Sequence, residues 1–117
     1  MDSEHIEEIF APVMRVVVRR MFGGHGIYAD DLFFALESGG VVYLKVDAAT
    51  QPQFEAAGSS PFVYQKAEKT IVMSFWRLVE SAYDDEDELR RWASLALESA
   101  RRAQAAKAEK AVRRRRR

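Results

Sequence analysis

IYADDLFFALESGGVVYLKV, residues 27–46, decides the fold class of this 117-residue chain. Two turn signals, Asp30-Asp31 and Ser38-Gly39-Gly40, separate three stretches that are rich in aromatic and aliphatic side chains. In the last stretch the apolar residues Val42, Leu44 and Val46 alternate, so they share one face of a strand. Short turns join neighbouring strands in antiparallel order. The stretch therefore predicts a β-hairpin followed by a further antiparallel strand.

A short helix is predicted at the start of the chain. Ser3 is a candidate N-cap, and apolar residues follow it at helical spacing from Ile6 to Val13. Pro12 has no amide donor and disfavours helical geometry at the residue before it. We expect the helix to end near this proline and the chain to enter a sheet.

The β-branched run at residues 15–22 reads as a strand, and the cluster Gly23-Gly24-His25-Gly26 follows it. Closely spaced glycines can let backbone amides approach a phosphate, but a phosphate loop opens a helix, and here the next segment is a strand. We therefore interpret the glycines as a flexible bend and His25 as a turn residue. His5 is the only other histidine, and no metal-binding spacing joins the two.

A second helix and a second hairpin are predicted after residue 46. Asp47 can cap a short helix over residues 53–57, which Gly58 ends. Residues 61–65 and 70–76 then read as two strands separated by a polar turn.

The last helix has the clearest local pattern. Asp85 with Glu88 forms an N-terminal capping arrangement, and apolar residues recur at helical spacing from Leu89 to Ala100. Beyond Ala100 the apolar residues are nearly all alanine, so we expect the helix to continue into solvent and to end before the arginines at 113–117.

These elements predict an α+β fold of the order α-β-β-β-α-β-β-α, with an antiparallel sheet of about five strands and helices packed on it. We expect one domain at residues 1–102 and a basic C-terminal tail at residues 103–117 that is a helical extension and then disordered.

The composition excludes several classes of protein. With 48% hydrophobic and 31% charged residues the chain is globular, and the absence of cysteine rules out disulfides, thiolate zinc sites and iron–sulfur clusters. Its longest apolar runs, such as residues 32–36, are too short to span a membrane. The N-terminus is acidic and does not resemble a secretory signal, so we expect a cytoplasmic protein without membrane association.

The net charge of zero hides an uneven distribution. Residues 1–100 carry nine basic and 17 acidic side chains, a formal charge of −8, whereas residues 101–117 carry nine basic residues and one glutamate, a formal charge of +8. A basic tail of this kind is typical of a nucleic-acid-binding arm. The candidate contacts are Arg101, Arg102, Lys107, Lys110, Arg113, Arg114, Arg115, Arg116 and Arg117. The tail can instead be a solvated helix end, or pair with the acidic body of its own or a neighbouring chain.

No pattern indicates an enzyme or a cofactor. The acidic run at residues 84–88 lacks the alternation of a calcium loop and is better explained as helix capping. None of the serines lies in a nucleophile elbow. Lys45 is either an anion contact or a charge that protects a strand edge. We therefore expect no catalytic residues, no metal site and no cofactor.

Several short motifs together resemble the TfoX N-terminal domain family. They are RRMFGG at 19–24, GIY at 26–28, FAL at 34–36, VYLKVD at 42–47, AG at 57–58, PF at 61–62 and the helix positions Trp92, Ala93, Ala96, Leu97 and Ala100. The similarity covers about residues 4–102 and implies an α+β fold with an antiparallel sheet. Its motif residues Arg20, Met21, Phe22, Gly23, Gly24, Gly26, Lys45 and Trp92 are expected to be structural.

The resemblance also suggests a function. Two-domain relatives, called TfoX or Sxy, regulate natural competence in bacteria by assisting the cyclic-AMP receptor protein at promoters. We therefore expect a non-enzymatic regulatory or adaptor domain, associated with transcription, that contacts an unidentified protein partner and holds nucleic acid nonspecifically through its tail. The alternative is a structural or oligomerising protein that does not bind nucleic acid. A third class, an enzyme or small-molecule binder with a site between sheet and helix, has no supporting motif.

Overall fold

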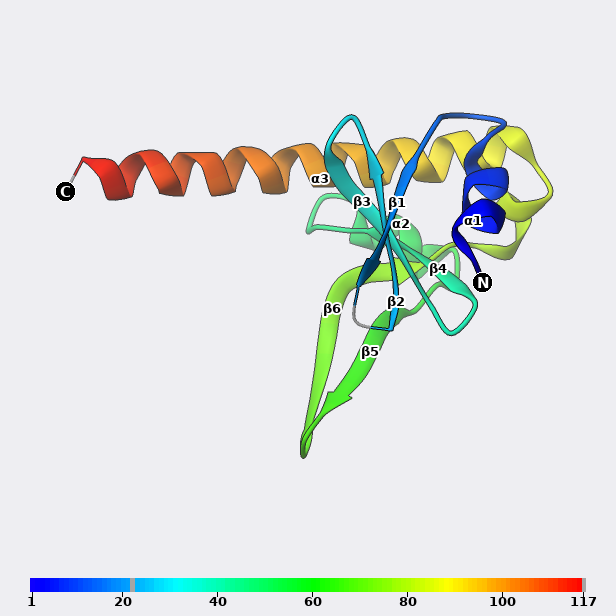
Figure 1. Ribbon diagram of the computed structural model, residues 1–117, viewed down its shortest axis with the longest axis horizontal. Helices are drawn as coiled ribbons and strands as arrows, with labels where there is room; N and C mark the ends of the chain where they lie inside the picture. The colour runs from blue at the N-terminus through cyan, green and yellow to red at the C-terminus, as the bar shows by residue number, and fades with distance from the viewer. Residues whose placement is uncertain (22, 117) are drawn as a thin grey trace.

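The stretch 27–46 lies in the middle of one antiparallel sheet in the computed structural model, which describes residues 1–21 and 23–116 (Figure 1). The strands are β1 (Val17–Met21), β2 (Gly24–Ala29), β3 (Leu32–Ser38), β4 (Val41–Lys45), β5 (Pro61–Lys66) and β6 (Lys69–Arg77). Their order across the sheet is β1-β2-β3-β4-β6-β5. The α+β class is confirmed. The sheet has six strands where about five were predicted, because the chain before Asp47 forms four strands.

Two-residue turns determine the register of the central strands. Asp30 and Asp31 have φ angles of 49° and 63°, and Gly39 and Gly40 have φ angles of 59° and 82°. Two successive positive φ angles are the signature of the tight turn whose twist matches that of a β-hairpin. Asp tolerates this region because its short polar side chain bonds locally, and glycine has no Cβ to clash. Both predicted turns are confirmed.

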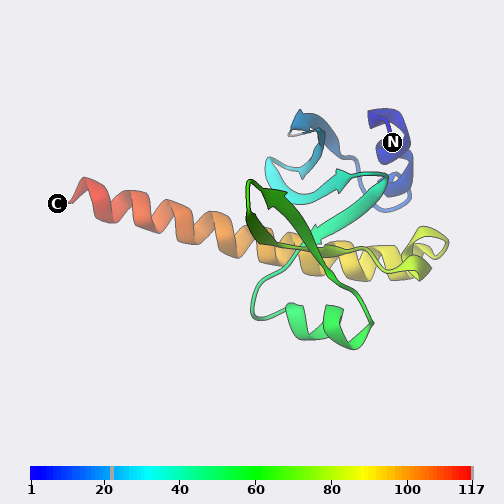
Figure 2. The ribbon, with the colours of Figure 1, turned by 90° about the horizontal axis from the view of Figure 1, so that it is seen from below.

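The helices gather on one face of this sheet (Figure 2). They are α1 (Ser3–Phe10), α2 (Gln51–Ala56) and α3 (Glu86–Arg115), with a short 3-10 turn η1 (Glu80–Tyr83) before α3. Phe10 of α1 meets Phe34 of β3 edge to face, with ring centroids 5.4 Å apart. Leu89, Ala93 and other α3 residues join the same buried cluster. The core therefore lies between the sheet and its helices.

The structure corrects several predicted boundaries. Asp2, rather than Ser3, caps α1, and its carboxylate accepts a hydrogen bond from the His5 amide over 2.9 Å. Thr50 precedes α2, and Asp47 instead accepts bonds from the amides of Ala49 and Thr50 in the turn before that helix. Helix α3 continues through Arg115, past the position where we expected it to end.

The glycine cluster also differs from the prediction. Gly24 and Gly26 lie within β2 rather than in a bend, and His25 between them is a strand residue. A Cβ on Gly24 would lie 2.1 Å from the carbonyl oxygen of Glu37, so the two backbones approach too closely for any side chain. Phe22, which belongs to the same motif, lies outside the described residues.

Trp92 is a central core residue, but its indole N–H lacks a hydrogen-bond acceptor among the described residues. Its side chain is 2% exposed, and its ring meets Phe54 of α2 edge to face at a centroid distance of 4.7 Å. The indole nitrogen is itself buried. A buried donor without a partner lowers stability.

We expect Trp92→Phe to change the free energy of unfolding by about 1 kcal/mol or less, because the loss of packing is offset by removal of the unpaired donor. Trp92→Ala should lose about 3–5 kcal/mol, because it opens a cavity. Urea denaturation of both variants measures the difference. Equal destabilisation by the two substitutions would contradict this account of the indole nitrogen.

Candidate nucleic-acid interface

The C-terminal part of α3 leaves the body as an exposed helix (Figures 1 and 2). Ala100 is the last buried residue, and every described residue after it is exposed. At 1.5 Å per residue, the segment from Arg101 to Arg115 is about 22 Å long. It has only alanines and Val112 as apolar residues, so it cannot bury a core of its own.

Two of the predicted contact residues already have acidic partners. Arg102 donates from Nε and Nη2 to the carboxylate of Asp47 over 2.6 Å and 3.1 Å. Arg113 donates to Glu109 one turn earlier, over 3.1 Å. Among the described residues, the other predicted cations form no salt bridge: they are Arg101, Lys107, Lys110, Arg114, Arg115 and Arg116. Arg117 lies outside the described part of the chain.

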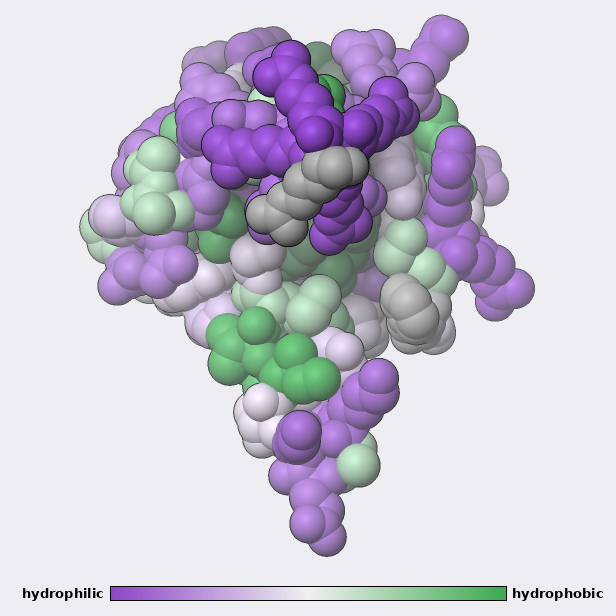
Figure 3. All heavy atoms as spheres, turned by 90° about the vertical axis from the view of Figure 1, so that its left-hand side faces the viewer, coloured by the Kyte–Doolittle hydropathy of each residue, from purple (hydrophilic) through white to green (hydrophobic). Residues whose placement is uncertain are grey.

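The unpaired cations surround the helix. Lys107, Lys110 and Arg114 follow one another at spacings of three and four, so they lie on one side. Arg101 and Arg115 project on the other side by the same helical geometry. Viewed from the C-terminal end of α3, hydrophilic residues form most of the upper part of the surface (Figure 3). The arrangement is a short rod of positive charge, suited to phosphates approaching from several directions.

The Arg102–Asp47 pair fixes the point at which the rod leaves the body. The hydrogen bonds from the Arg102 guanidinium hold the pKa of Asp47 down at about 2. Beside this pair, the hydroxyls of Thr50 and Ser99 form a buried hydrogen bond of 3.0 Å. Both contacts join α3 to the turn after β4. Arg102 is therefore bound to the body, unlike the cations that the structure describes between Lys107 and Arg116.

Two of the family motif residues, Met21 and Lys45, make side-chain contacts within the fold. Met21 lies against Gly26, where a Cβ would meet the Met21 methyl carbon at 2.5 Å. Arg20 is exposed and lies across from His25 in the β1–β2 register. Lys45 donates to the hydroxyl of Ser74 over 2.6 Å and lies 5.1 Å from the ring centroid of Phe75. Burial lowers the pKa of Lys45, and the charge of Asp47 opposes that effect.

A buried hydrogen bond between two side chains, His25 and Glu37, was missed by the sequence analysis. His25 Nδ1 lies 2.6 Å from Glu37 Oε1, and the other carboxylate oxygen accepts the Gly40 amide over 2.9 Å. The Glu37 side chain is only 4% exposed. Burial raises its pKa, but the bonds from His25 and Gly40 outweigh burial and lower it overall. Our interpretation of His25 as a turn residue is therefore wrong.

Aromatic rings line the sheet face opposite the helices. Tyr28 stacks on Phe33 at a centroid distance of 5.1 Å, and Phe33 meets Phe75 at 5.0 Å. Arg19 lies over the Tyr28 ring, 5.0 Å from its centroid.

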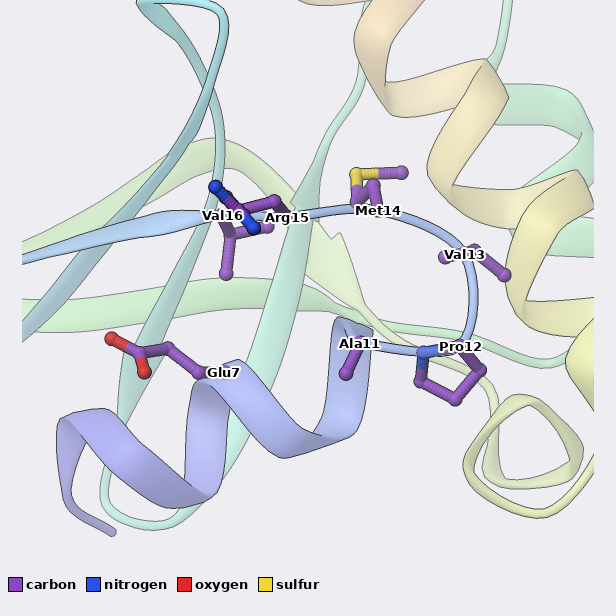
Figure 4. A pocket seen from close by; sticks show the side chains of 7 residues that line it. All are labelled: Glu7, Ala11, Pro12, Val13, Met14, Arg15 and Val16. Atoms are coloured by element: carbon purple, nitrogen blue, oxygen red, sulfur yellow. The ribbon is translucent and has the colours of Figure 1, made fainter.

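An apolar groove of about 410 Å³ lies between this face and the β5–β6 hairpin. Met21, Phe33, Leu36, Phe62, Tyr64 and Met73 supply most of its lining. A wider hollow of about 700 Å³ lies at the loop between α1 and β1, where Glu7 and Arg15 are its charged residues (Figure 4). Within the described ranges, no three His, Asp or Glu residues lie together as metal ligands would.

The architecture defines a small α+β domain in which helices cover one face of a twisted antiparallel sheet. The family model of the TfoX N-terminal domain matches residues 8–100, and the chain belongs to that family. The matched region ends where α3 leaves the body, so the basic rod lies beyond it. A sequence comparison with curated proteins gives no significant match. Among the described residues, no helix is both long and apolar enough to cross a membrane.

We expect Arg102→Gln to raise the pKa of Asp47 from about 2 toward its ordinary value of 3.8. Because the folded-state pKa is depressed, the contribution of Asp47 to stability is present above its ordinary pKa and is lost as pH falls toward 2. Carboxyl chemical shifts followed by NMR during an acid titration measure the change. Arg90→Gln, which breaks an exposed pair within α3, is the control and should leave the Asp47 titration unaltered. An unchanged Asp47 pKa in Arg102→Gln would contradict the assignment.

We expect Glu37→Gln to lower the free energy of unfolding by about 1–3 kcal/mol at neutral pH, because it removes the charged partner of His25. The folded-state pKa of Glu37 is lowered, so the difference from the wild type should shrink as pH falls below 4.5. Urea denaturation across that pH range measures it. Glu55→Gln, at an exposed position on α2, is the control. A difference that does not vary with pH would show that the charge of Glu37 is not the cause.

Proposed function

We propose that this chain is a non-enzymatic regulatory or adaptor domain that holds nucleic acid nonspecifically through the projecting part of α3. The observation that supports this most strongly is that six cations in the described part of the chain beyond Ala100 are exposed and have no acidic partner there. Phosphate neutralisation depends on charge density and requires no pocket.

The charge distribution also supports a separate role for the body. Residues 1–100 carry a formal charge of −8, which favours contact with a basic protein surface. Such an adaptor would keep a protein partner close to nucleic acid. Membership of the TfoX N-terminal domain family supports a proposed role in bacterial transcription, which the protein would carry out in the cytoplasm.

Binding to a fluorescent DNA duplex of about 20 base pairs across a salt series tests the proposal. Each phosphate contact contributes about −0.9 to the slope of log K against log salt, so five or six contacts give a slope of about −5. The variant Lys107→Gln/Lys110→Gln/Arg114→Gln/Arg115→Gln/Arg116→Gln should lose at least about tenfold in affinity at low salt. Gln has a helix propensity similar to that of Lys and Arg, so α3 should persist, which circular dichroism checks.

Lys66→Gln/Lys69→Gln is the matched control, because it removes two exposed cations at the distant tip of the β5–β6 hairpin. It should bind DNA nearly as well as the wild type. Equal losses in both variants, or no binding by the wild type at low salt, would overturn the proposal. The latter result would favour a structural or oligomerising protein without nucleic-acid binding.

A further inference from the structure

The β5–β6 hairpin has an unpaired edge and exposed apolar side chains. Strand β5 is the last in the sheet order, and the hairpin extends away from the helices (Figure 1). Val63 is 44% exposed, Tyr64 38% and Val72 64%. Figure 3 shows strongly hydrophobic side chains gathered on this side of the molecule, below the basic helix. An exposed apolar edge strand is a template for pairing with another strand.

The hairpin geometry determines which backbone groups are free. Ala67 and Glu68 form a two-residue turn, so the flanking pair Lys66 and Lys69 is hydrogen-bonded. Bonding then alternates from Lys66 to Val63, and Tyr64 bonds toward Ile71 of β6. The N–H and C=O groups of Val63 and Gln65 therefore point outward, away from the sheet. The register with β6 shifts between Pro61 and Val63, and beyond this shift Ser60 accepts a hydrogen bond from the Arg77 amide, so the Pro61 carbonyl also points outward.

The opposite edge of the sheet is protected against pairing. Strand β1 carries two consecutive charged residues, Arg19 and Arg20, in its five positions. Charged side chains on an edge oppose pairing with a second strand. Strand β5 has one charge, Lys66, at its last position. The two edges therefore differ, and β5 is the one available for pairing.

We propose that β5 pairs in antiparallel order with β5 of a second copy of this chain, about a two-fold axis at Val63. In this register the Val63 N–H and C=O groups of the two copies bond to each other. The Gln65 N–H donates to the carbonyl of Pro61 in the second copy, and Pro61 has no N–H to leave unpaired. The free donors that the hairpin geometry leaves on Val63 and Gln65 are thus satisfied.

The side chains are self-complementary in the same register. Phe62 lies opposite Tyr64 of the second copy, an aromatic pair that stabilises adjacent strands. Lys66 lies opposite Ser60, so the pairing brings no like charges together. Phe62 and Tyr64 already line the apolar groove with Met21 and Met73. Their counterparts extend this apolar surface across the axis and remove it from water.

Analytical ultracentrifugation of the full chain, without nucleic acid, tests the proposal from about 10 µM to about 1 mM, a range suited to a weak interface. The wild type should shift from a mass of 13.4 kDa to twice that value as concentration rises. Val63→Lys should remain at the mass of one chain, because it brings two charges together at the axis. Val17→Lys, on β1 and at a similarly exposed valine, is the matched control and should dimerise like the wild type.

The effect of salt on the measured mass distinguishes this dimer from one in which the basic helix of one copy pairs with the acidic body of another. Edge pairing should persist at about 1 M NaCl, where charge pairs are screened beyond about 3 Å. Amide hydrogen exchange supplies a second readout, in which Val63 and Gln65 become protected as concentration rises, while Tyr64 is protected throughout. A wild type of constant single-chain mass, a dimer that Val63→Lys leaves intact, or one that high salt dissociates would overturn the proposal.

Discussion

The packing of α3 against the sheet is the interaction on which the rest of the molecule depends. Ala93, Ala96 and Ala100 have almost no exposed surface, and their small side chains allow the helix to lie close to the strands. Leu89 and Trp92 fill the wider space near its start. Because α3 continues unbroken past Ala100, this packing also sets the direction of the basic rod.

The same packing gives the sheet two chemically different faces. One face is buried under helices, while the other carries stacked aromatic rings and an apolar groove. The outer part of the β5–β6 hairpin extends beyond the helices, so Val63, Tyr64 and Val72 remain exposed. The nucleic-acid contact proposed for α3 and the self-pairing proposed for β5 would therefore use separate surfaces, and a dimer would carry two basic rods.

Local chemistry explains which features the sequence predicted well. The turns at Asp30-Asp31 and Gly39-Gly40 depend on adjacent residues, as does the cap that Asp85 forms with Glu88. The missed contacts join distant residues: His25 and Glu37 are 12 positions apart, and Asp47 and Arg102 are 55 apart. No spacing rule connects such pairs. The motifs RRMFGG and GIY include two glycines that the fold requires, because Gly24 lies against the backbone of Glu37 and Gly26 lies against the side chain of Met21.

The sequence alone determined the α+β class, the hairpin turns and the separation of an acidic body from a basic C-terminal segment, because each is set by neighbouring residues or by composition. The tertiary structure decided which cations remain unpaired, where His25 lies and which strand edge is open. These depend on strand register and on the way α3 crosses the sheet. Burial of the core as a whole selects that arrangement, since no short segment can bury its apolar surface alone.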